Sequence, residues 1–401
     1  MVLLITEILT TIFMFIVLYF TFLFLIIFLS DRKKLNSSPK MEKFPSLSII
    51  IPAYNEEGTI VKTVETIRKL KYPRGFGIVV VDDGSTDETY EVARKIKGIR
   101  ILRQEHGGKA RALNFALKKA GGEIVACVDS DSYPETDTLM KTIPFFSDKQ
   151  VAAVTTSIYA KEAKNMMQRL QRIEYILIAF TRKLLESINA IYCTPGPMSF
   201  YRKNVLIDVG GFDEKNLTED IEIAWRLLSR NHKIKMSLDS KVYTNVPQNI
   251  HKWWRQRLRW NMGGTQTTLK YMKLFFKKGF GNIGTFVLPF FFIAYIVTFM
   301  GLVVSLLIIA SFLNYLIGAG TYGFNLIRPF LIAPDIIFFW GLFLFAISVV
   351  FIKINARSIK ESRNVRRSFL DYFTYLFFYT SIFPINLIHS IFKLLRKDYK
   401  W

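Results

Sequence analysis

The sequence predicts an α/β domain with a largely parallel sheet, joined to α-helical transmembrane segments. Strand-like and helix-like segments alternate between about residues 45 and 250, and the strands among them are continuous apolar runs. Long apolar segments almost without charge precede and follow this region. Alternating strands and helices imply parallel strands with right-handed crossovers, and a continuous apolar strand is typical of one buried on both faces. The 401 residues suffice for one such domain together with membrane segments.

The first segment, residues 1–30, predicts a transmembrane helix. Between Val2 and Ser30 the one charged residue is Glu7, and about 20 apolar residues are enough to cross a bilayer. A cleaved signal peptide fits less well, because the start is not basic, the apolar run is long and no small-residue cleavage site follows. The next residues, Asp31 to Lys34, are mostly basic. Since basic flanks tend to stay cytoplasmic, we expect the polar middle of the chain to lie inside the cell.

The predicted domain, residues 45–250, consists of strands and connecting helices in regular alternation. Its expected strands are Leu47–Pro52, Gly77–Val81, Ile99–Leu102, Glu123–Val128 and Val151–Tyr159. Its expected helices are Gly58–Leu70, Thr86–Ile96, Lys109–Lys119, Gln168–Glu186 and a helix capped by Thr218 that ends near Ser229.

Residues 251–282 predict helices at the membrane surface. A segment rich in Trp and Arg is expected to end at Gly263-Gly264. Residues Leu269–Phe280 then alternate Lys with Tyr, Met, Leu and Phe, which is typical of an amphipathic helix lying in the membrane surface.

Residues 283–393 predict a C-terminal transmembrane region. Two spans are expected at about Phe286–Leu313 and Ile336–Ile354. The last apolar segment, Phe369–Phe392, is interrupted by Pro384. It is either a re-entrant or kinked hairpin, or a span that leaves the basic tail, residues 394–401, outside the cell against the usual tendency.

The formal net charge of +22 has two interpretations. Clustered Lys and Arg bind polyanions such as nucleic acid, but they also bind anionic lipid at the cytoplasmic surface. The basic clusters lie next to the apolar segments, which favours membrane lipid as the partner and argues against nucleic acid. Cys127 and Cys193 are the only cysteines and do not form a C-x-x-C pair, so a zinc cluster or a disulfide framework is excluded.

Two acidic motifs follow predicted strands. Asp82-Asp83-Gly84 and Asp129-Ser130-Asp131 each stand at the carboxyl end of a strand, where parallel sheets bind their ligands. Each motif taken alone is also compatible with an ordinary surface turn. A D-x-D pair suits Mg²⁺ or Mn²⁺, because these cations prefer carboxylate oxygens and bridge to substrate phosphates. The shared position predicts that the two motifs meet in space.

Three further motifs suit the binding of an anionic substrate. The segment His106 to Lys109 opens a helix with two glycines, as an anion site does, although it lacks the Walker A spacing. Glu219-Asp220 opens another helix, either as favourable first-turn charges or as a general base. The stretch Trp253 to Trp260 combines Arg forks for phosphate with indoles for sugar faces, although a membrane-surface helix would have a similar composition.

Together these segments resemble family 2 glycosyltransferases, and more narrowly the membrane-embedded branch of cellulose, hyaluronan and poly-N-acetylglucosamine synthases. The resemblance covers about residues 46–264. It is carried by six segments: Pro52 to Glu57, Asp82-Asp83-Gly84, Gly108 to Asn114, Asp129-Ser130-Asp131, Thr218-Glu219-Asp220 and Gln256-x-x-Arg259-Trp260. It implies a GT-A-type nucleotide-sugar-binding domain. The chain shows one clear N-terminal span where many relatives have two.

The resemblance also implies a role for each motif residue. Tyr54, Glu56, Asp82 and Asp83 would contact the nucleotide, with support from Lys109. Asp131 and Asp129 would hold Mg²⁺ or Mn²⁺ on the diphosphate. Asp220 would be the catalytic base, with Glu219 beside it. Arg257 and Arg259 would bind the nucleotide sugar, while Gln256 and Trp260 would bind the acceptor.

The expected activity is inverting transfer from a nucleotide sugar, UDP-N-acetylglucosamine or UDP-glucose, onto a growing β-linked polysaccharide exported through the chain's own transmembrane region. The protein would be a multi-pass protein of the cell membrane. One alternative is a non-processive enzyme that adds a single sugar to a lipid-linked acceptor. A remote alternative is a basic membrane protein that binds a polyanion or transports a solute, which would leave the acidic motifs unexplained and would need intramembrane charges that the spans lack.

Overall fold

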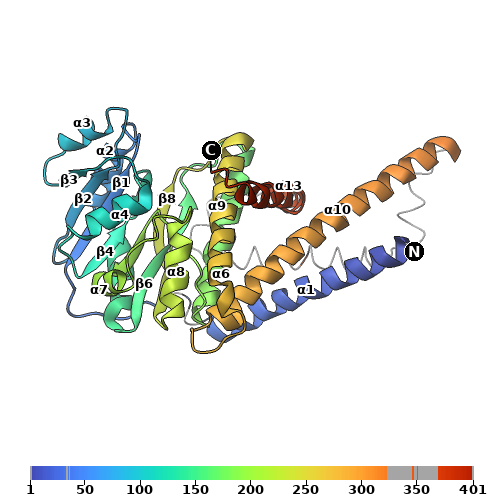
Figure 1. Ribbon diagram of the computed structural model, residues 1–401, viewed down its shortest axis with the longest axis horizontal. Helices are drawn as coiled ribbons and strands as arrows, with labels where there is room; N and C mark the ends of the chain where they lie inside the picture. The colour runs from blue at the N-terminus through green and yellow to red at the C-terminus, as the bar shows by residue number, and fades with distance from the viewer. Residues whose placement is uncertain are drawn as a thin grey trace. The chain divides into compact units, whose positions relative to one another are not determined.

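The computed structural model describes residues 2–32, 35, 37–322, 346, 350 and 369–399. The chain divides into two compact units (Figure 1). One unit comprises Met1–Ser30 and Phe290–His389, and the other comprises Asp31–Pro289 and Ser390–Trp401.

The larger unit is built on a mixed eight-stranded sheet in the order β3-β2-β1-β4-β7-β6-β8-β5. Its strands are β1 (Leu47–Ala53), β2 (Gly77–Asp82), β3 (Arg100–Arg103), β4 (Ile124–Cys127), β5 (Ser132–Pro134), β6 (Val151–Ala160), β7 (Ser199–Arg202) and β8 (Lys233–Thr244). Only β7 and β5 run against the others, since β7 pairs antiparallel with β4 and β6, and β5 pairs antiparallel with β8. The sheet is therefore mostly parallel, as predicted.

The strands predicted as continuous apolar runs form the centre of this sheet. All residues of β1 are buried, and its Ile50 stands opposite Val79 of β2 and Cys127 of β4. The five predicted strands are confirmed as β1, β2, β3, β4 and β6. The prediction missed the short β5 and β7. It also missed β8, although Lys233 and Lys235 alternate there with the buried Ile234 and Met236, as in a strand with one solvated face.

The helices of the larger unit connect these strands. They are α2 (Ile60–Arg68), α3 (Thr89–Arg94), α4 (Lys109–Leu117), α5 (Thr138–Thr142), α6 (Met166–Glu186), α7 (Lys203–Asp208), α8 (Glu219–Ser229) and α9 (Ile250–Tyr271), with short helical turns at η1 (Ile143–Ser147), η2 (Met272–Leu274) and η3 (Ile283–Val287). α4 packs against β1 and β2, whereas α6 packs against β6 and β8. A capping box between Asn165 and Gln168 starts α6.

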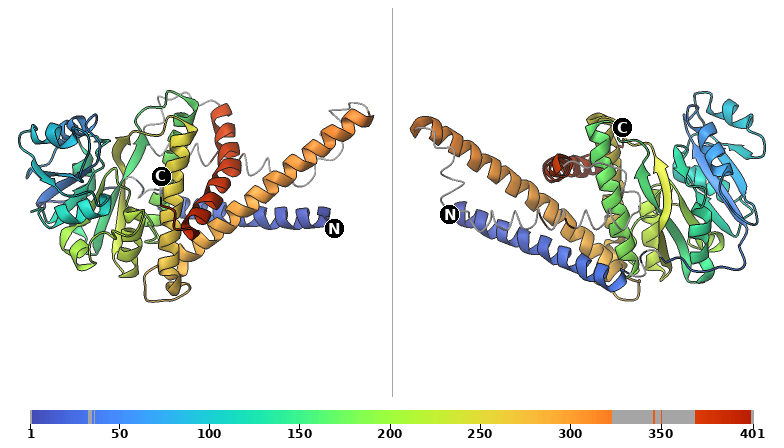
Figure 2. Two further views of the ribbon diagram at one scale, coloured as in Figure 1. Left: turned by 45° about the horizontal axis from the view of Figure 1, so that its top comes forward. Right: turned by 180° about the vertical axis from the view of Figure 1, so that it is seen from behind.

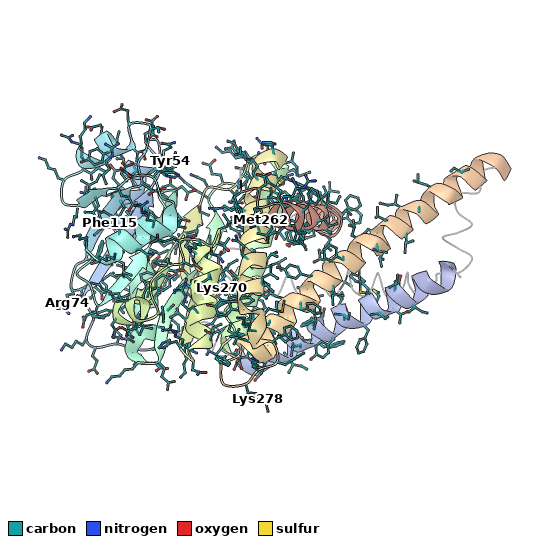
Figure 3. All side chains as sticks on the ribbon, in the orientation of Figure 1. Tyr54, Arg74, Phe115, Met262, Lys270 and Lys278 are labelled. Atoms are coloured by element: carbon teal, nitrogen blue, oxygen red, sulfur yellow. The ribbon has the colours of Figure 1, made fainter. Side chains whose placement is uncertain are left out.

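Helix α9 differs from the expectation in two ways. It runs through Gly263 and Gly264 rather than ending there. It then ends at Tyr271, so no single helix covers Leu269–Phe280, and that part of the expectation is wrong. Gly279 and Gly281 have positive φ angles of 92° and 58°, which a helix cannot contain. Lys270, labelled in Figure 3, forms ion pairs with Glu222 of α8 and with Asp213.

The smaller unit consists of long apolar helices, which Figure 2 shows from two further sides. In the part of the chain that the structure describes, its long helices are α1 (Val2–Asp31), α10 (Leu288–Tyr322) and α13 (Phe369–Leu395). The segments Ile8–Asp31, Ile283–Leu307 and Leu370–Leu395 are long and apolar enough to cross a membrane. The rings of Phe20 in α1 and Phe290 in α10 meet edge to face, with centroids 5.5 Å apart.

These helices bear on the predicted spans. The first two agree with α1 and α10, whereas the span predicted at Ile336–Ile354 lies outside the described residues except for positions 346 and 350. Pro384 stands inside α13, which is continuous, so the hairpin interpretation of Phe369–Phe392 is wrong. A proline removes one backbone hydrogen bond, and transmembrane helices tolerate this loss.

Candidate active site

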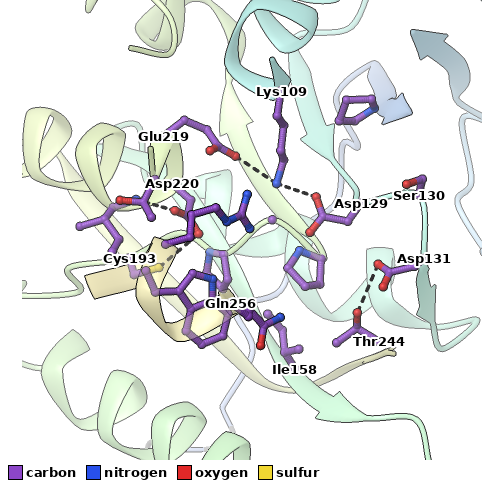
Figure 4. A pocket seen from close by; sticks show the side chains of 18 of the residues that line it. Lys109, Asp129, Ser130, Asp131, Ile158, Cys193, Glu219, Asp220, Thr244 and Gln256 are labelled. Carbon is purple, nitrogen blue, oxygen red and sulfur yellow. Dashed lines mark hydrogen bonds and ion pairs between the residues drawn. The ribbon is translucent and has the colours of Figure 1, made fainter. Parts of the chain in front are cut away.

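A cavity of about 570 Å³ lies where β1, β2 and β4 end (Figure 4). Parallel pairing brings the three carboxyl ends together, so the segments that follow these strands share one wall. The opposite walls come from α6, from residues 192–197, from the start of α8 and from α9. The cavity is lined by Tyr54, Glu56, Asp83, His106, Lys109, Asp129, Asp131, Tyr175, Arg182, Cys193, Glu219, Asp220, Gln256, Arg259, Trp260 and their neighbours.

Asp83 directly follows β2, and its side chain contacts the loop that precedes α4. Its carboxylate accepts hydrogen bonds from the backbone N–H groups of Gly107 and Gly108, at 3.1 and 2.8 Å, and from the side chain of Gln104. The imidazole of His106 lies 3.0 Å from the same carboxylate and stacks on the ring of Tyr54, with centroids 4.2 Å apart. The half-exposed Tyr54 ring is thereby fixed at the cavity edge, next to a buried acid.

Lys109, the first residue of α4, links two acidic motifs. Its ammonium lies 2.6 Å from Asp129 and 3.0 Å from Glu219 (Figure 4). Burial alone would lower the pKa of Lys109, but the carboxylates of Asp129, Glu219 and Asp220 together raise it above its ordinary value. Gly196 permits this cluster, because a Cβ there would lie 2.3 Å from the Lys109 ammonium and 2.6 Å from an Asp129 oxygen.

Asp131 lies on the far side of Asp129 from this lysine. Its carboxylate accepts a hydrogen bond of 3.3 Å from the hydroxyl of Thr244. Burial, followed by the negative charges of Asp129 and Glu56, raises the pKa of Asp131 to about 6. Crowded acids with few donors form a site that a cation would stabilise.

Asp220 stands in the first turn of α8, opposite residues 193–194. Its backbone carbonyl accepts hydrogen bonds from the N–H and the hydroxyl of Thr194, and the thiol of Cys193 lies 3.6 Å from its Oδ2. Burial, with the adjacent Glu219 carboxylate, raises the pKa of Asp220 to about 6. Lys109 has the opposite effect on Glu219, whose pKa it holds below the ordinary value against the effect of burial. The pKa values of these two neighbouring acids are therefore shifted in opposite directions, as is typical of groups that serve acid–base catalysis.

Helix α9 presents Gln256, Arg259 and Trp260 to the cavity. Their spacing of three and four residues places them on one face of the helix. The indole of Trp260 packs against an apolar cluster that contains Ile158 and Tyr175. Trp260, Ile158 and Tyr175 all line the cavity, so the indole belongs to an apolar part of its wall.

Arg257 does not line the cavity, contrary to the expectation that it binds the nucleotide sugar. Its side chain is 1% exposed and forms a two-point ion pair with Glu174 of α6, one hydrogen bond of which, from Nε, measures 3.1 Å. Its guanidinium also lies 4.1 Å from the ring centroid of Trp260 and donates to the amide oxygen of Gln256. Arg257 thus supports the two residues assigned to the acceptor.

Asp82 also lies outside the lining, because its side chain is fully buried and its carboxylate lies 3.0 Å from Arg103. The structure brings the remaining predicted residues together around one cavity. These are Tyr54, Glu56, Asp83, Lys109, Asp129, Asp131, Glu219, Asp220, Gln256, Arg259 and Trp260. Their individual roles stay predictions.

The sequence interpretation assigned no function to several lining residues. Tyr175, Arg182, Tyr192 and Cys193 belong to α6 and to the segment before β7, and they reach the cavity only through the fold. Residues 194–197, Thr-Pro-Gly-Pro, offered one signal, since a Gly between two prolines marks a turn that can closely approach other groups.

The residues present fit a divalent cation. Within the described ranges no group of three or more His, Cys, Asp or Glu side chains is arranged to hold a metal by itself. Asp129 and Asp131 offer carboxylate oxygens on one side of the cavity, and the raised pKa of Asp131 reflects negative charge that a cation would offset. Two carboxylates with substrate phosphates as further ligands are the donor set that Mg²⁺ and Mn²⁺ use.

Comparisons with known proteins agree with this geometry. Residues 48–210 match the model of glycosyl transferase family 2. The chain is 31% identical over 247 residues to a poly-beta-1,6-N-acetyl-D-glucosamine synthase from Staphylococcus aureus strain MSSA476, covering 60% of each chain. It is 30% identical over 235 residues to the synthase of that name from Staphylococcus epidermidis, covering 57% of each. The chain therefore aligns with about three fifths of the length of these curated relatives.

A solved structure supports the fold. The mannosyltransferase PcManGT from Pyrobaculum calidifontis, in complex with GDP-Man and Mn²⁺, superposes with a TM-score of 0.64 at 19% identity, covering 97% of this chain and 99% of that one. At this identity the likeness concerns the fold, which is the GT-A fold expected from the sequence. Residues 48–210 of this chain form a glycosyl transferase family 2 domain, and the chain is similar to poly-N-acetylglucosamine synthases.

Proposed function

We propose that this protein is an inverting, metal-dependent membrane glycosyltransferase. It transfers a sugar from a nucleotide sugar, UDP-N-acetylglucosamine or UDP-glucose, to the end of a growing β-linked polysaccharide. The names of the staphylococcal relatives favour N-acetylglucosamine. The observation that carries the proposal is the position of Asp220, a carboxyl group with a pKa raised to about 6, in the same cavity as Lys109, Asp129, Asp131 and Arg259.

One set of residues around the cavity would bind the nucleotide, and a second set would stabilise the negative charge of the diphosphate. Tyr54, Glu56 and Asp83 stand at the carboxyl ends of β1 and β2, where the nucleotide would lie. Asp129 and Asp131 would hold Mg²⁺ or Mn²⁺, which supplies positive charge to the departing diphosphate when it is bound. Lys109 and Arg259 add fixed positive charge beside it, and charge placed in advance stabilises a transition state without reorganisation.

Asp220 acts on the acceptor. An acceptor hydroxyl at the face of Trp260 gives its proton to the Asp220 carboxylate as its oxygen attacks the anomeric carbon. The new C–O bond forms while the bond between that carbon and the diphosphate breaks, and the electron pair leaves with the nucleoside diphosphate. One such displacement inverts the anomeric carbon, so an α-linked donor gives a β-linkage.

The long apolar helices support a membrane location for this activity. We place the protein in the cell membrane with several spans and the GT-A domain on the cytoplasmic side, where nucleotide sugars are made and where the basic flanks favour its location. The polymer would be exported through the chain's own transmembrane region.

A second candidate is transfer of a single sugar to a lipid-linked acceptor. The wall of the cavity formed by α6 favours it, because Tyr175, Ile178 and Ala179 give that side an apolar surface. Both candidates use the same donor site and base, and they differ only in the product.

The deciding experiment incubates membranes containing the full chain with a panel of radiolabelled nucleotide sugars and Mn²⁺ or Mg²⁺. Label in high-molecular-weight polymer supports the polysaccharide synthase, and label in one lipid-extractable product supports single transfer. If no nucleotide sugar is consumed under any of these conditions, the proposed enzymatic function is wrong. Membranes carrying the Asp220→Asn chain supply the background.

A further inference from the structure

Arg182 is a buried cation at the cavity wall that forms no ion pair within the described part of the chain. Its side chain lines the cavity and the residue is 6% exposed. Its Nη1 atom is buried and has no hydrogen-bond partner, and no carboxylate among the described residues forms an ion pair with it. Arg257 of α9 differs from it in this respect, since it pairs with Glu174.

A buried arginine without an anionic partner lowers the stability of the folded state unless a bound ligand supplies that partner. A buried charge loses its hydration, and an arginine offers five N–H donors in a planar fork. Proteins regain this loss through an anionic partner, and the fork fits the two oxygens of a carboxylate or a phosphate. A cavity-lining arginine that forms no ion pair with a described residue therefore indicates a ligand with a negatively charged oxygen.

Arg182 lies on the side of the cavity that contains Asp220, so the anionic oxygen would belong to the acceptor rather than to the donor. Tyr175, Ile178, Ala179 and Arg182 stand at positions i, i+3, i+4 and i+7 of α6, one face of the helix, and all four line the cavity. The positive charge of Arg182 also acts on Tyr192 and Cys193, where it partly offsets the rise in pKa that burial causes. The Cys193 thiol touches Asp220, the proposed base, whereas the acids proposed for the metal lie on the other side of the cavity in Figure 4.

We infer that Arg182 is an anchor for an acceptor that carries an anionic oxygen, a phosphate or a carboxylate, close to the hydroxyl that Asp220 deprotonates. The inference rests on the proposed function and narrows it. A chain of N-acetylglucosamine or glucose alone has no anionic oxygen, so the acceptor would be a lipid phosphate or a chain that also contains an acidic sugar. The adjacent apolar stripe of α6 would cover an apolar part of the same molecule. The two sources of such an oxygen are a lipid phosphate and a sugar carboxylate.

The test compares ligands that differ chiefly in one charged group. Methyl β-glucuronide, methyl β-glucoside and methyl β-glucosaminide are respectively anionic, neutral and partly cationic at pH 7.5, and farnesyl phosphate with farnesol forms a matched lipid pair. Each is added to the purified full chain, with Mn²⁺ and the nucleotide sugar that the radiolabelled panel selects, and its inhibition constant against transfer is measured. We expect the anionic member of at least one series to bind about tenfold more tightly than its neutral counterpart, which would be the effect of one charge-assisted pair.

The variants then assign the preference to Arg182. In Arg182→Met we expect the anionic and neutral ligands to bind within about twofold of each other, and in Arg182→Lys the preference should survive in weaker form because the charge remains. Arg172→Met removes a cation from the same helix outside the cavity lining and should keep the wild-type preference. The melting temperature of Arg182→Met should stay equal or rise, since an unpaired buried charge is lost.

The outcomes separate the inference from the function on which it rests. If wild-type chain turns over donor but binds charged and neutral ligands equally, the anchor is wrong while the glycosyltransferase stands, whether or not Arg182→Met folds. A preference that persists in Arg182→Met assigns the charge recognition to another residue and also overturns it. A large fall in melting temperature for both variants would show a structural arginine. Preference within the glycoside series identifies a carboxylate, and preference within the farnesyl pair identifies a phosphate.

Discussion

The side chain of Thr218, at the start of α8, lies directly against the bare backbone of Gly263 in α9. A Cβ at Gly263 would stand 2.2 Å from the Thr218 Oγ1 and 2.6 Å from its Cγ2. The next two residues after Thr218 are Glu219 and Asp220, and Gly263 follows Trp260 by less than one helical turn. This contact therefore helps to set the distance between the proposed base and the residues proposed to bind the acceptor.

Gly263→Ala should separate the two helices. Overpacking of this kind costs about 1–3 kcal/mol, and we expect a lower melting temperature together with a fall of at least tenfold in kcat for transfer. The neighbouring variant Gly264→Ala is the control, because its Cβ would meet nothing closer than Ile221 Cδ1 at 4.0 Å. It should be neutral or more stable, since Ala is preferred to Gly inside a helix by about 1 kcal/mol. Equal effects of the two substitutions would contradict this account of the contact.

Asp220 should set the acidic limb of the pH–rate profile. The base accepts a proton only as a carboxylate, and with a pKa of about 6 it becomes protonated as the pH falls through that value. We expect kcat/KM to be level above this pH and to fall about tenfold per pH unit below it. Asp220→Asn should lose about 10²- to 10⁴-fold in turnover, keep donor binding and lack this limb. Normal turnover in Asp220→Asn would move the role to another group, with Glu219 as the first to test by Glu219→Gln.

Chelation should stop the reaction. Asp129 and Asp131 carry negative charge that a divalent cation would neutralise, so EDTA should abolish transfer and Mn²⁺ or Mg²⁺ should restore it. Asp131→Asn should raise the Mn²⁺ concentration needed for half-maximal activity by at least tenfold. Asp148→Asn, which removes an exposed carboxylate paired with Lys233 elsewhere, should leave this concentration unchanged. Full activity in excess EDTA would refute the metal requirement.

Trp260 should serve the acceptor rather than the donor. An indole under a sugar ring stabilises the bound saccharide without touching the leaving group. Trp260→Ala should therefore reduce transfer far more than hydrolysis of the donor by water, and it should shorten the polymer if the enzyme is processive. Product length on a sizing gel, read beside the released nucleotide, measures both effects. Trp254→Ala removes an indole of the same helix that lies outside the cavity lining and should leave the product unchanged. A polymer of unchanged length from Trp260→Ala would be evidence against the role.

The sequence predicts the sheet and the acidic half of the site well, for a simple physical reason. Asp83 directly follows the mostly apolar β2, and Asp129 and Asp131 lie in the short segment after the apolar β4. Parallel pairing brings such strand ends together. Positions on α9 are harder to assign, because Arg257 is only one or two residues from Gln256 and Arg259. Arg257 points away from the cavity because it pairs with Glu174, which lies 83 residues earlier in the chain. No local sequence pattern predicts this partner.

The limits of α9 and the role of α6 also depended on tertiary contacts. Gly263 and Gly264 are a reasonable stop signal in an isolated helix, but here Gly263 is needed for close packing against Thr218. Arg182 is one of many basic residues in the sequence, and only the fold shows that it is buried without a carboxylate. Site residues that follow a strand can be found from sequence, whereas those on a packed helix face require its partners.

The position of Gln256, Arg259 and Trp260 on one continuous helix has a consequence for how this enzyme could change its substrate. A continuous helix moves as a rigid unit, so the backbone of none of the three residues can shift to suit a new acceptor without displacing the other two. The lining residues of α6 stand on a second helix and differ in chemistry from one turn to the next. Variation in acceptor choice, in natural relatives or in directed evolution, should therefore accumulate at Tyr175, Ile178, Ala179 and Arg182, while the helix that serves the chemistry stays as it is.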